Sequence, residues 1–166
     1  MKTLYVLRHA KSSWDDASLG DHDRPLSGRG RRAAALIGKH MGEEGIRPQL
    51  VLCSSAARAR QTLEGLGDGA GAVEVDSDLY LASGEELTAR LRKIEPDVAS
   101  VMVVGHNPGM QDLVLTLASQ GRDLDRVSEK FPTAALATLV IDGDWSDLGE
   151  RDARLVSLVL PKDLSG

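Results

Sequence analysis

Two histidines and two arginines follow short apolar runs of this 166-residue sequence: Arg8 and His9 come after residues 4–7, Arg58 after 50–53, and His106 after 101–104. The planar guanidinium of arginine matches the oxygens of a phosphate group, and two arginines together neutralise a dianion. A neutral imidazole is available as a nucleophile at neutral pH. This combination predicts phosphoryl chemistry rather than metal binding, because the neighbouring arginines would repel a cation.

The apolar runs predict the strands of a layered α/β fold, because they alternate with longer segments of helical periodicity. The expected strands are Thr3–Leu7, Leu50–Cys53, Val73–Val75, Val101–Val104, Ala137–Ile141 and Arg154–Leu160. The expected helices are Ser27–Glu44, Ala56–Leu66, Gly84–Ile94 and Pro108–Ser119. We find no repeat and no domain boundary, and we therefore expect a single domain over residues 1–166.

The predicted strands position the candidate residues. In open α/β sheets, ligands bind in the crevice beyond the carboxyl ends of the strands. Three strand ends are therefore expected to bring both histidines together with Arg8 and Arg58. Arg24 lies in the irregular stretch 12–24, which follows the first strand and can reach the same crevice. A second irregular stretch, 121–133, is also long enough to shape the entrance of a site.

Two other chemistries fit the spacing less well. A cysteine phosphatase loop places five residues between its cysteine and its arginine, whereas four separate Cys53 from Arg58, so Cys53 is predicted to be a small buried residue. A metallohydrolase needs a cluster of His and carboxylate ligands, and the sequence has no HExxH motif. The remaining histidines and the arginines of the first helix are predicted to be structural or solvated: His22, His40, Arg29, Arg31 and Arg32.

The charge balance of the chain limits the kinds of molecule that it can bind. Lys and Arg number 20 against 25 Asp and Glu, and the resulting net charge of −5 argues against nucleic acid or an anionic membrane as partner. Aromatic residues make up only 3%, which disfavours stacking on nucleic-acid bases. A single cysteine and the lack of an apolar run of membrane length predict a soluble, cytoplasmic protein, with a monomer as the default state. A bound anion must be held by a local group of cations.

Three segments, in this order, resemble the signatures of the histidine phosphatase superfamily: Leu7-Arg8-His9-Ala10-Lys11, Ser54-Ser55-Ala56-Ala57-Arg58-Ala59-Arg60-Gln61-Thr62 and Gly105-His106-Asn107-Pro108. The short chain and the segment Asp21–Ser27 are most similar to the SixA-type phosphohistidine phosphatase branch of that superfamily. The wider superfamily usually has Gly where this sequence has Ala10, and Ala is common in the SixA-type branch. The resemblance runs from Leu4 to about Gln111.

The resemblance implies a fold and a mechanism. The fold is a three-layer α/β/α sandwich around a mostly parallel, mixed central sheet, similar to phosphoglycerate mutase and without a large cap domain. His9 is implied as the nucleophile, which forms a covalent phosphohistidine that water then hydrolyses. Arg8, Arg58 and His106 are implied to hold the phosphoryl oxygens, and Arg24 matches a further phosphate contact. This chemistry requires no metal and no other cofactor.

A general acid is not obvious in the sequence. Superfamily members that act on alkyl phosphates carry a carboxylate between the second arginine motif and the second histidine. This interval offers Asp76, Asp78, Glu85 and Glu86, of which the last three are the candidate acids. The residues around these carboxylates do not match the acid motif of the members that act on alkyl phosphates. Glu85 and Glu86 fit the first turn of a helix instead, where negative charge complements the helix dipole. Because imidazole leaves phosphorus more easily than an alkoxide does, the lack of a clear acid favours a phosphoramidate such as phosphohistidine, or a phenol-like ester, as substrate.

Three functions are compatible with the sequence. The first is a phosphatase that acts on a phosphorylated protein, such as a phosphorelay histidine domain. The second is a phosphomonoesterase for a small phosphorylated compound, with one of the three carboxylates as acid. The third is a non-catalytic module that binds phosphate or a phosphoprotein, and the presence of both His9 and His106 argues against it.

Overall fold

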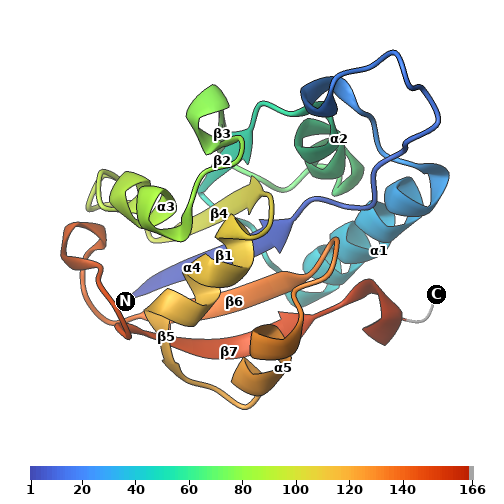
Figure 1. Ribbon diagram of the computed structural model, residues 1–166. Coiled ribbons are helices and arrows are strands. Elements are labelled where there is room, and N and C mark those ends of the chain that lie inside the picture. The colour runs from blue at the N-terminus through green and yellow to red at the C-terminus, as the bar shows by residue number, and fades with distance from the viewer. Residues whose placement is uncertain (165–166) are drawn as a thin grey trace.

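The computed structural model describes residues 1–164 and has a mixed sheet with helices on both of its faces (Figure 1). The strands are β1 (Lys2–Arg8), β2 (Leu50–Ser54), β3 (Ala72–Asp76), β4 (Ser100–Gly105), β5 (Ala118–Gln120), β6 (Leu136–Ile141) and β7 (Ala153–Val159). The helices are α1 (Gly28–Glu44), α2 (Ala57–Gly65), α3 (Gly84–Leu91), α4 (Gly109–Leu117) and α5 (Leu124–Glu129). Short 3₁₀ helices include η1 (Asp21–Asp23), η2 (Ser77–Leu79) and η4 (Pro161–Asp163). No helix within residues 1–164 is long and apolar enough to cross a membrane.

The strand order is β3-β2-β4-β1-β6-β7-β5. β3, β2, β4 and β1 pair in parallel, whereas β6 is antiparallel to both β1 and β7. Since β5 pairs in parallel with β7, β6 is the one strand of the described sheet that runs against the others. The mostly parallel, mixed sheet is therefore confirmed. β2, β4 and β1 are neighbours, so the three strand ends that carry the candidate residues lie side by side.

Alternate side chains of the central strands enter two separate cores. Leu4 and Val6 of β1 are fully buried and pack in one cluster with Leu113 of α4, together with residues of α3 and α5. Leu7 of the same strand packs in a second cluster with Ile37 of α1 and residues of α2. Because both faces of the strand are covered, its sequence is continuously apolar, and the arrangement has the three predicted layers (Figure 1).

Two short elements differ from the prediction. The helix expected over residues 108–119 ends at Leu117, and the next three residues form β5, which pairs with β7. The stretch 121–133, expected to be irregular, contains the six-residue helix α5. Both predictions were wrong because such short elements show no clear periodicity. β5 also depends on pairing with a strand that follows much later in the chain.

Candidate active site

The ends of β1 and β4 place the two histidines beside each other. Arg8, the last residue of β1, lies opposite Gly105 at the end of β4, and the backbone N–H of His9 donates to the Gly105 carbonyl over 2.9 Å. His106 follows directly, and the centroids of the two imidazole rings are 5.1 Å apart. Residues far apart in the sequence thus meet because parallel strands deliver them to the same edge of the sheet.

All five residues implied to act on phosphate line one cavity of about 290 Å³, which we call the strand-end cavity. Its lining residues are Arg8, His9, Lys11, Ser12, Trp14, Arg24, Arg58, Leu81, His106, Asn107 and Thr133. The positive charges come from four different places: β1, the segment that follows it, the end of η1 and the first turn of α2. A cavity with this lining favours a small dianion.

The surroundings of His9 leave one ring nitrogen free to attack. Nδ1 lies 2.7 Å from the carbonyl oxygen of Ala10, and since a carbonyl oxygen only accepts, Nδ1 carries the ring hydrogen. Nε2 therefore holds the lone pair. Burial, together with the nearby Arg58, Arg8 and Arg24, lowers the pKa of His9 to about 4, although the Ala10 contact opposes the shift. The imidazole is thus neutral and nucleophilic at neutral pH.

Helices α1 and α2 fix the backbone that follows the nucleophile. The N–H of Ala10 donates to the Thr62 hydroxyl over 2.9 Å, and this hydroxyl donates to the carbonyl of Arg58 over 2.7 Å. Thr62 is fully buried. On the other side, a Cβ at Gly30 would lie 2.0 Å from the carbonyl oxygen of Lys11, so only glycine allows α1 to approach this closely. These contacts hold the Ala10 carbonyl, and with it the orientation of the imidazole.

His106 is held through Nε2, whereas His9 is held through Nδ1. Its Nε2 lies 2.7 Å from the hydroxyl of Ser54, a fully buried residue at the end of β2. Burial, together with the proximity of His9 and Arg58, lowers the pKa of His106 to about 3, so this ring is also neutral at neutral pH. When the Ser54 hydroxyl donates to Nε2, the hydrogen of the ring sits on Nδ1. Nδ1 can then donate to a ligand.

Asp21 links two of the arginines. Its Oδ1 accepts from Nε and Nη2 of Arg24 over 3.3 and 3.1 Å, and its Oδ2 accepts from Nη2 of Arg58 over 3.0 Å. The Tyr80 hydroxyl donates to the same Oδ2. This Tyr80 contact and the two guanidinium groups hold the pKa of Asp21 well below its usual range. The carboxylate is ionised and fixes the arginines in place.

Unpartnered nitrogens mark where a ligand belongs. In the described part of the chain, three buried side-chain nitrogens have no hydrogen-bond partner: Arg8 Nε, Arg58 Nε and His106 Nδ1. All three belong to residues that line the strand-end cavity. Buried donors are stabilised when they find an acceptor, so residues that carry such donors suit an oxyanion ligand. A phosphoryl group in the cavity offers several oxygens as acceptors.

The three carboxylates considered as general acids lie elsewhere. Asp78 is in η2, and Glu85 and Glu86 are in the first turn of α3. Glu86 accepts from the backbone N–H of Ser83 over 3.1 Å and completes the N-terminal capping box of that helix. None of the three lines the strand-end cavity, and among residues 1–164 no carboxylate is part of its lining.

Cys53 is unsuited to be a nucleophile. It is fully buried within the core on the α1 and α2 side of the sheet. Burial raises the pKa of the thiol to about 12, so the thiol stays protonated at neutral pH, and its Sγ lies 3.4 Å from the Ser54 carbonyl. The position agrees with a small packing residue.

Among the neighbours of the site that were missed in the sequence are Asp21, Tyr80 and His22. Asp21 and Tyr80 were not considered, and His22 was taken as structural. The Nε2 of His22 lies 2.7 Å from the Ser55 hydroxyl, and its ring meets the edge of the Tyr80 ring. Only Asp21 had a usable signal, because a carboxylate three residues before Arg24 is placed to pair with it in a helical turn.

The three-layer α/β fold and the comparisons with known proteins define a phosphatase, a hydrolase that acts on phosphoryl groups. A model of the histidine phosphatase superfamily (branch 1) matches residues 4–83. Phosphohistidine phosphatase SixA of Escherichia coli (strain K12) is 30% identical over 144 residues, which cover 84% of this chain and 85% of that protein. The chain belongs to the histidine phosphatase superfamily and is a SixA-like phosphatase.

Two solved structures show the same architecture. SixA from Nakamurella multipartitia superposes with a TM-score of 0.83 at 32% identity, covering 96% of each chain. The protein histidine phosphatase SixA complexed with tungstate superposes with a TM-score of 0.80 at 26% identity, covering 98% of this chain and 99% of that one.

Proposed function

We propose that the protein removes the phosphoryl group from phosphohistidine of another protein, through a covalent phosphohistidine on His9. The observation that carries the proposal is the orientation of the His9 ring: its Nδ1–H is bound to the Ala10 carbonyl, so the lone pair of Nε2 is free beside the arginines that line the cavity. The similar SixA complexed with tungstate, an oxyanion of phosphate-like shape, supports an oxyanion site in this fold.

The first step transfers the phosphoryl group to the enzyme. Nε2 of His9 attacks phosphorus, a P–Nε2 bond forms, and the bond between phosphorus and the substrate imidazole breaks. The N–H donors of Arg8 and Arg58 and the Nδ1–H of His106 lie around the cavity, where they stabilise the charge on the three equatorial oxygens. These donors are fixed before the substrate arrives, so little reorganisation is needed in the transition state.

The second step releases phosphate. A water oxygen attacks phosphorus and the P–Nε2 bond breaks. Both water protons stay with the phosphate product, one on the attacking oxygen and one transferred to a phosphoryl oxygen. Because Nδ1 of His9 keeps its hydrogen in the bond to the Ala10 carbonyl, the ring leaves as neutral imidazole. No proton from a separate acid is needed, and the enzyme returns to its starting state.

The lack of an acid supports phosphohistidine as substrate. Among residues 1–164 no carboxylate lines the cavity, and Asp21 beside it has a lowered pKa, so it is not a proton donor at neutral pH. An alkoxide leaving group requires such a proton. A phosphorylated imidazole carries a proton on its other ring nitrogen near neutral pH and leaves as neutral imidazole.

A panel of phosphorylated compounds tests this proposal. We expect kcat/KM to be highest for a phosphohistidine peptide, lower for p-nitrophenyl phosphate, whose phenolate leaves easily, and lowest for a simple alkyl phosphate. The readout is phosphate release by the purified protein at neutral pH. An alkyl phosphate cleaved as fast as the phosphohistidine peptide would show that a general acid operates and would overturn the choice of substrate.

A further inference from the structure

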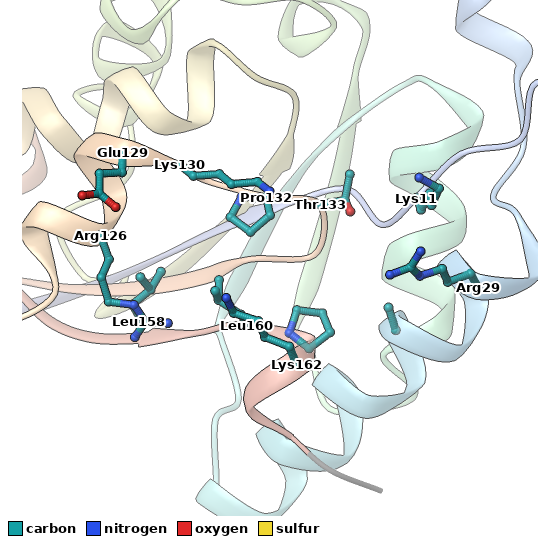
Figure 2. A pocket seen from close by; sticks show the side chains of 12 residues that line it. Lys11, Arg29, Arg126, Glu129, Lys130, Pro132, Thr133, Leu158, Leu160 and Lys162 are labelled. Atoms are coloured by element: carbon teal, nitrogen blue, oxygen red, sulfur yellow. The ribbon is translucent and has the colours of Figure 1, made fainter.

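A second cavity, of about 440 Å³, adjoins the active site and has a lining unusual for an acidic chain (Figure 2). We call it the basic groove. Its cations are Lys11, Arg29, Arg126, Lys130 and Lys162, and one acid, Glu129, shares the lining. Lys11 and Arg29 lie on one side of the groove in Figure 2, and Arg126 lies on the other. A chain with a net charge of −5 therefore gathers positive charge at this place.

Most of this charge is uncompensated. Arg126 pairs with Asp123 over 3.3 Å and with Asp163 over 3.5 Å. For the other four cations of the groove, no carboxylate of residues 1–164 comes within ion-pair distance. All four are exposed to solvent. The groove thus keeps an attractive potential for an anionic partner.

The groove lies next to the strand-end cavity. Lys11 and Thr133 line both. The strand-end cavity has room for a phosphoryl group and its nearest atoms, so the body of a phosphorylated protein must stay outside and contact what surrounds the opening. The basic groove is part of those surroundings, and it would meet residues that neighbour the phosphorylated histidine.

The groove also has apolar walls. Pro132, Leu158, Leu160 and Pro161 are among its lining residues. The cations come from separate elements and are exposed, so they do not form the tight, buried cage that holds a small free anion. Apolar walls below dispersed positive charges suit a polypeptide that offers both carboxylates and apolar side chains.

We propose that the basic groove docks an acidic, partly apolar stretch of the phosphohistidine-bearing protein, beside its phosphorylated residue. The inference rests on the proposed function of the strand-end cavity, and it adds the chemistry by which the partner is recognised. Docking of this kind raises the rate of productive encounter and lowers KM, without a change in the chemical step.

Three substrates with the same reacting group test the proposal. They are free phosphohistidine, a phosphohistidine peptide flanked by glutamates, and the same peptide with lysines in place of the glutamates. The test variant is Lys130→Glu/Lys162→Glu, which reverses two groove charges outside the strand-end cavity. The matched control is Lys39→Glu/Lys93→Glu, which makes the same change of net charge at exposed positions that do not line the groove.

We expect the wild type to hydrolyse the glutamate peptide with a kcat/KM about tenfold above that of the lysine peptide, as exposed charges at the edge of an interface typically allow. The Lys130→Glu/Lys162→Glu variant should lose or invert this preference, whereas the control variant should keep it. Hydrolysis of free phosphohistidine should stay within about twofold in all three proteins, because it does not reach the groove. Equal rates for both peptides in the wild type, or an unchanged preference in the test variant, would overturn the proposal.

A binding measurement separates this inference from the proposed function. The unphosphorylated glutamate peptide, labelled with a fluorophore, is titrated with each protein and followed by anisotropy. Weaker binding of the peptide to the test variant than to the control variant supports docking in the basic groove. If no phosphohistidine substrate is hydrolysed while this difference in binding is seen, only the proposed function fails. Equal binding to both variants contradicts docking in the groove.

Discussion

The protein has two neighbouring groups of cations that differ in how they are held. In the strand-end cavity, Arg24 and Arg58 are buried, with 7% and 4% of their surface exposed. Both form ion pairs with Asp21. In the basic groove, Lys130 and Lys162 are exposed and have no ion-pair partner among the described residues. The two arginines are shielded from water and held by ion pairs, whereas the two lysines are exposed to solvent and unpaired within residues 1–164.

This difference separates chemistry from recognition. Buried, fixed donors act strongly on charge that develops at a defined point, which is what phosphoryl transfer requires. Exposed charges act weakly at any one point but over a longer range, which suits the capture of an acidic partner. Substitutions in the cavity are therefore expected to change kcat/KM for every substrate, and substitutions in the groove only for protein or peptide substrates.

Among substitutions of the charged residues in the cavity and the groove, the largest effect is expected for Arg58→Ala. It removes a buried guanidinium from the phosphoryl site and leaves Asp21 without one of its two arginine partners. We expect kcat/KM to fall by roughly 10²–10³-fold for free phosphohistidine and for peptides alike, as is typical when one fixed donor is lost from a site. Arg60→Ala is the matched control, because Arg60 lies on the same helix, is exposed and does not line the cavity. A fall in kcat/KM that is seen only with peptide substrates would contradict the distinction between the cations of the strand-end cavity and those of the basic groove.

A smaller loss is expected for Asp21→Asn. The amide keeps the size of the side chain but lacks the charge that fixes both Arg24 and Arg58. We expect kcat/KM to drop by on the order of tenfold, because the donors stay present but are less well positioned. Asp21→Glu, which retains the charge, should lose less. Steady-state kinetics with free phosphohistidine gives the comparison, and full activity of the Asn variant would show that Asp21 does not position the arginines.

The buried histidines should make the stability of the fold depend on pH. The folded-state pKa values are about 4 for His9 and about 3 for His106, and both lie below the ordinary value of 6.5. The unfolded chain therefore takes up protons first, and the free energy of unfolding falls as the pH drops from about 6.5 towards 4. Urea unfolding at several pH values measures this slope. His9→Gln should flatten it, and an unchanged slope would mean that the His9 ring is not held neutral.

The smallest effect is expected from salt. Raising the ionic strength from about 0.01 to 0.15 M shortens the screening length from roughly 30 to 8 Å. The preference for the glutamate peptide over the lysine peptide should shrink by about threefold, since the groove charges are exposed. The kcat/KM for free phosphohistidine should change less, because Arg24 and Arg58 of the cavity are buried. Equal salt sensitivity of the two quantities would contradict the proposed division between cavity and groove.

The parts of the fold that depend on burial could be predicted from the sequence. β1, β2 and β4 are covered on both faces, and their continuous apolar runs led directly to the residues that follow them, Arg8, His9 and His106. The three-residue β5 carries no such signal, because it exists only through pairing with β7.

Contacts between loops could not be predicted in the same way. Tyr80 reaches Asp21 across 59 positions of the chain, and neither residue follows a strand. Arg29 was correctly expected to be exposed, but its place in the wall of the basic groove depends on how η4 and the segment before β6 pack beside α1. Such contacts form only in the completed fold, and no local pattern in the sequence indicates them.

The central claim is that Nε2 of His9 carries the phosphoryl group during turnover. The direct test is to mix the protein with phosphohistidine labelled with ³²P, to quench within milliseconds in alkaline detergent, because the P–N bond is labile in acid, and to map the label on peptides. We predict label on His9 in the wild type and none in His9→Ala or His9→Asn, both of which should also lose turnover. Label at another residue, or label that persists in both variants, would contradict the account.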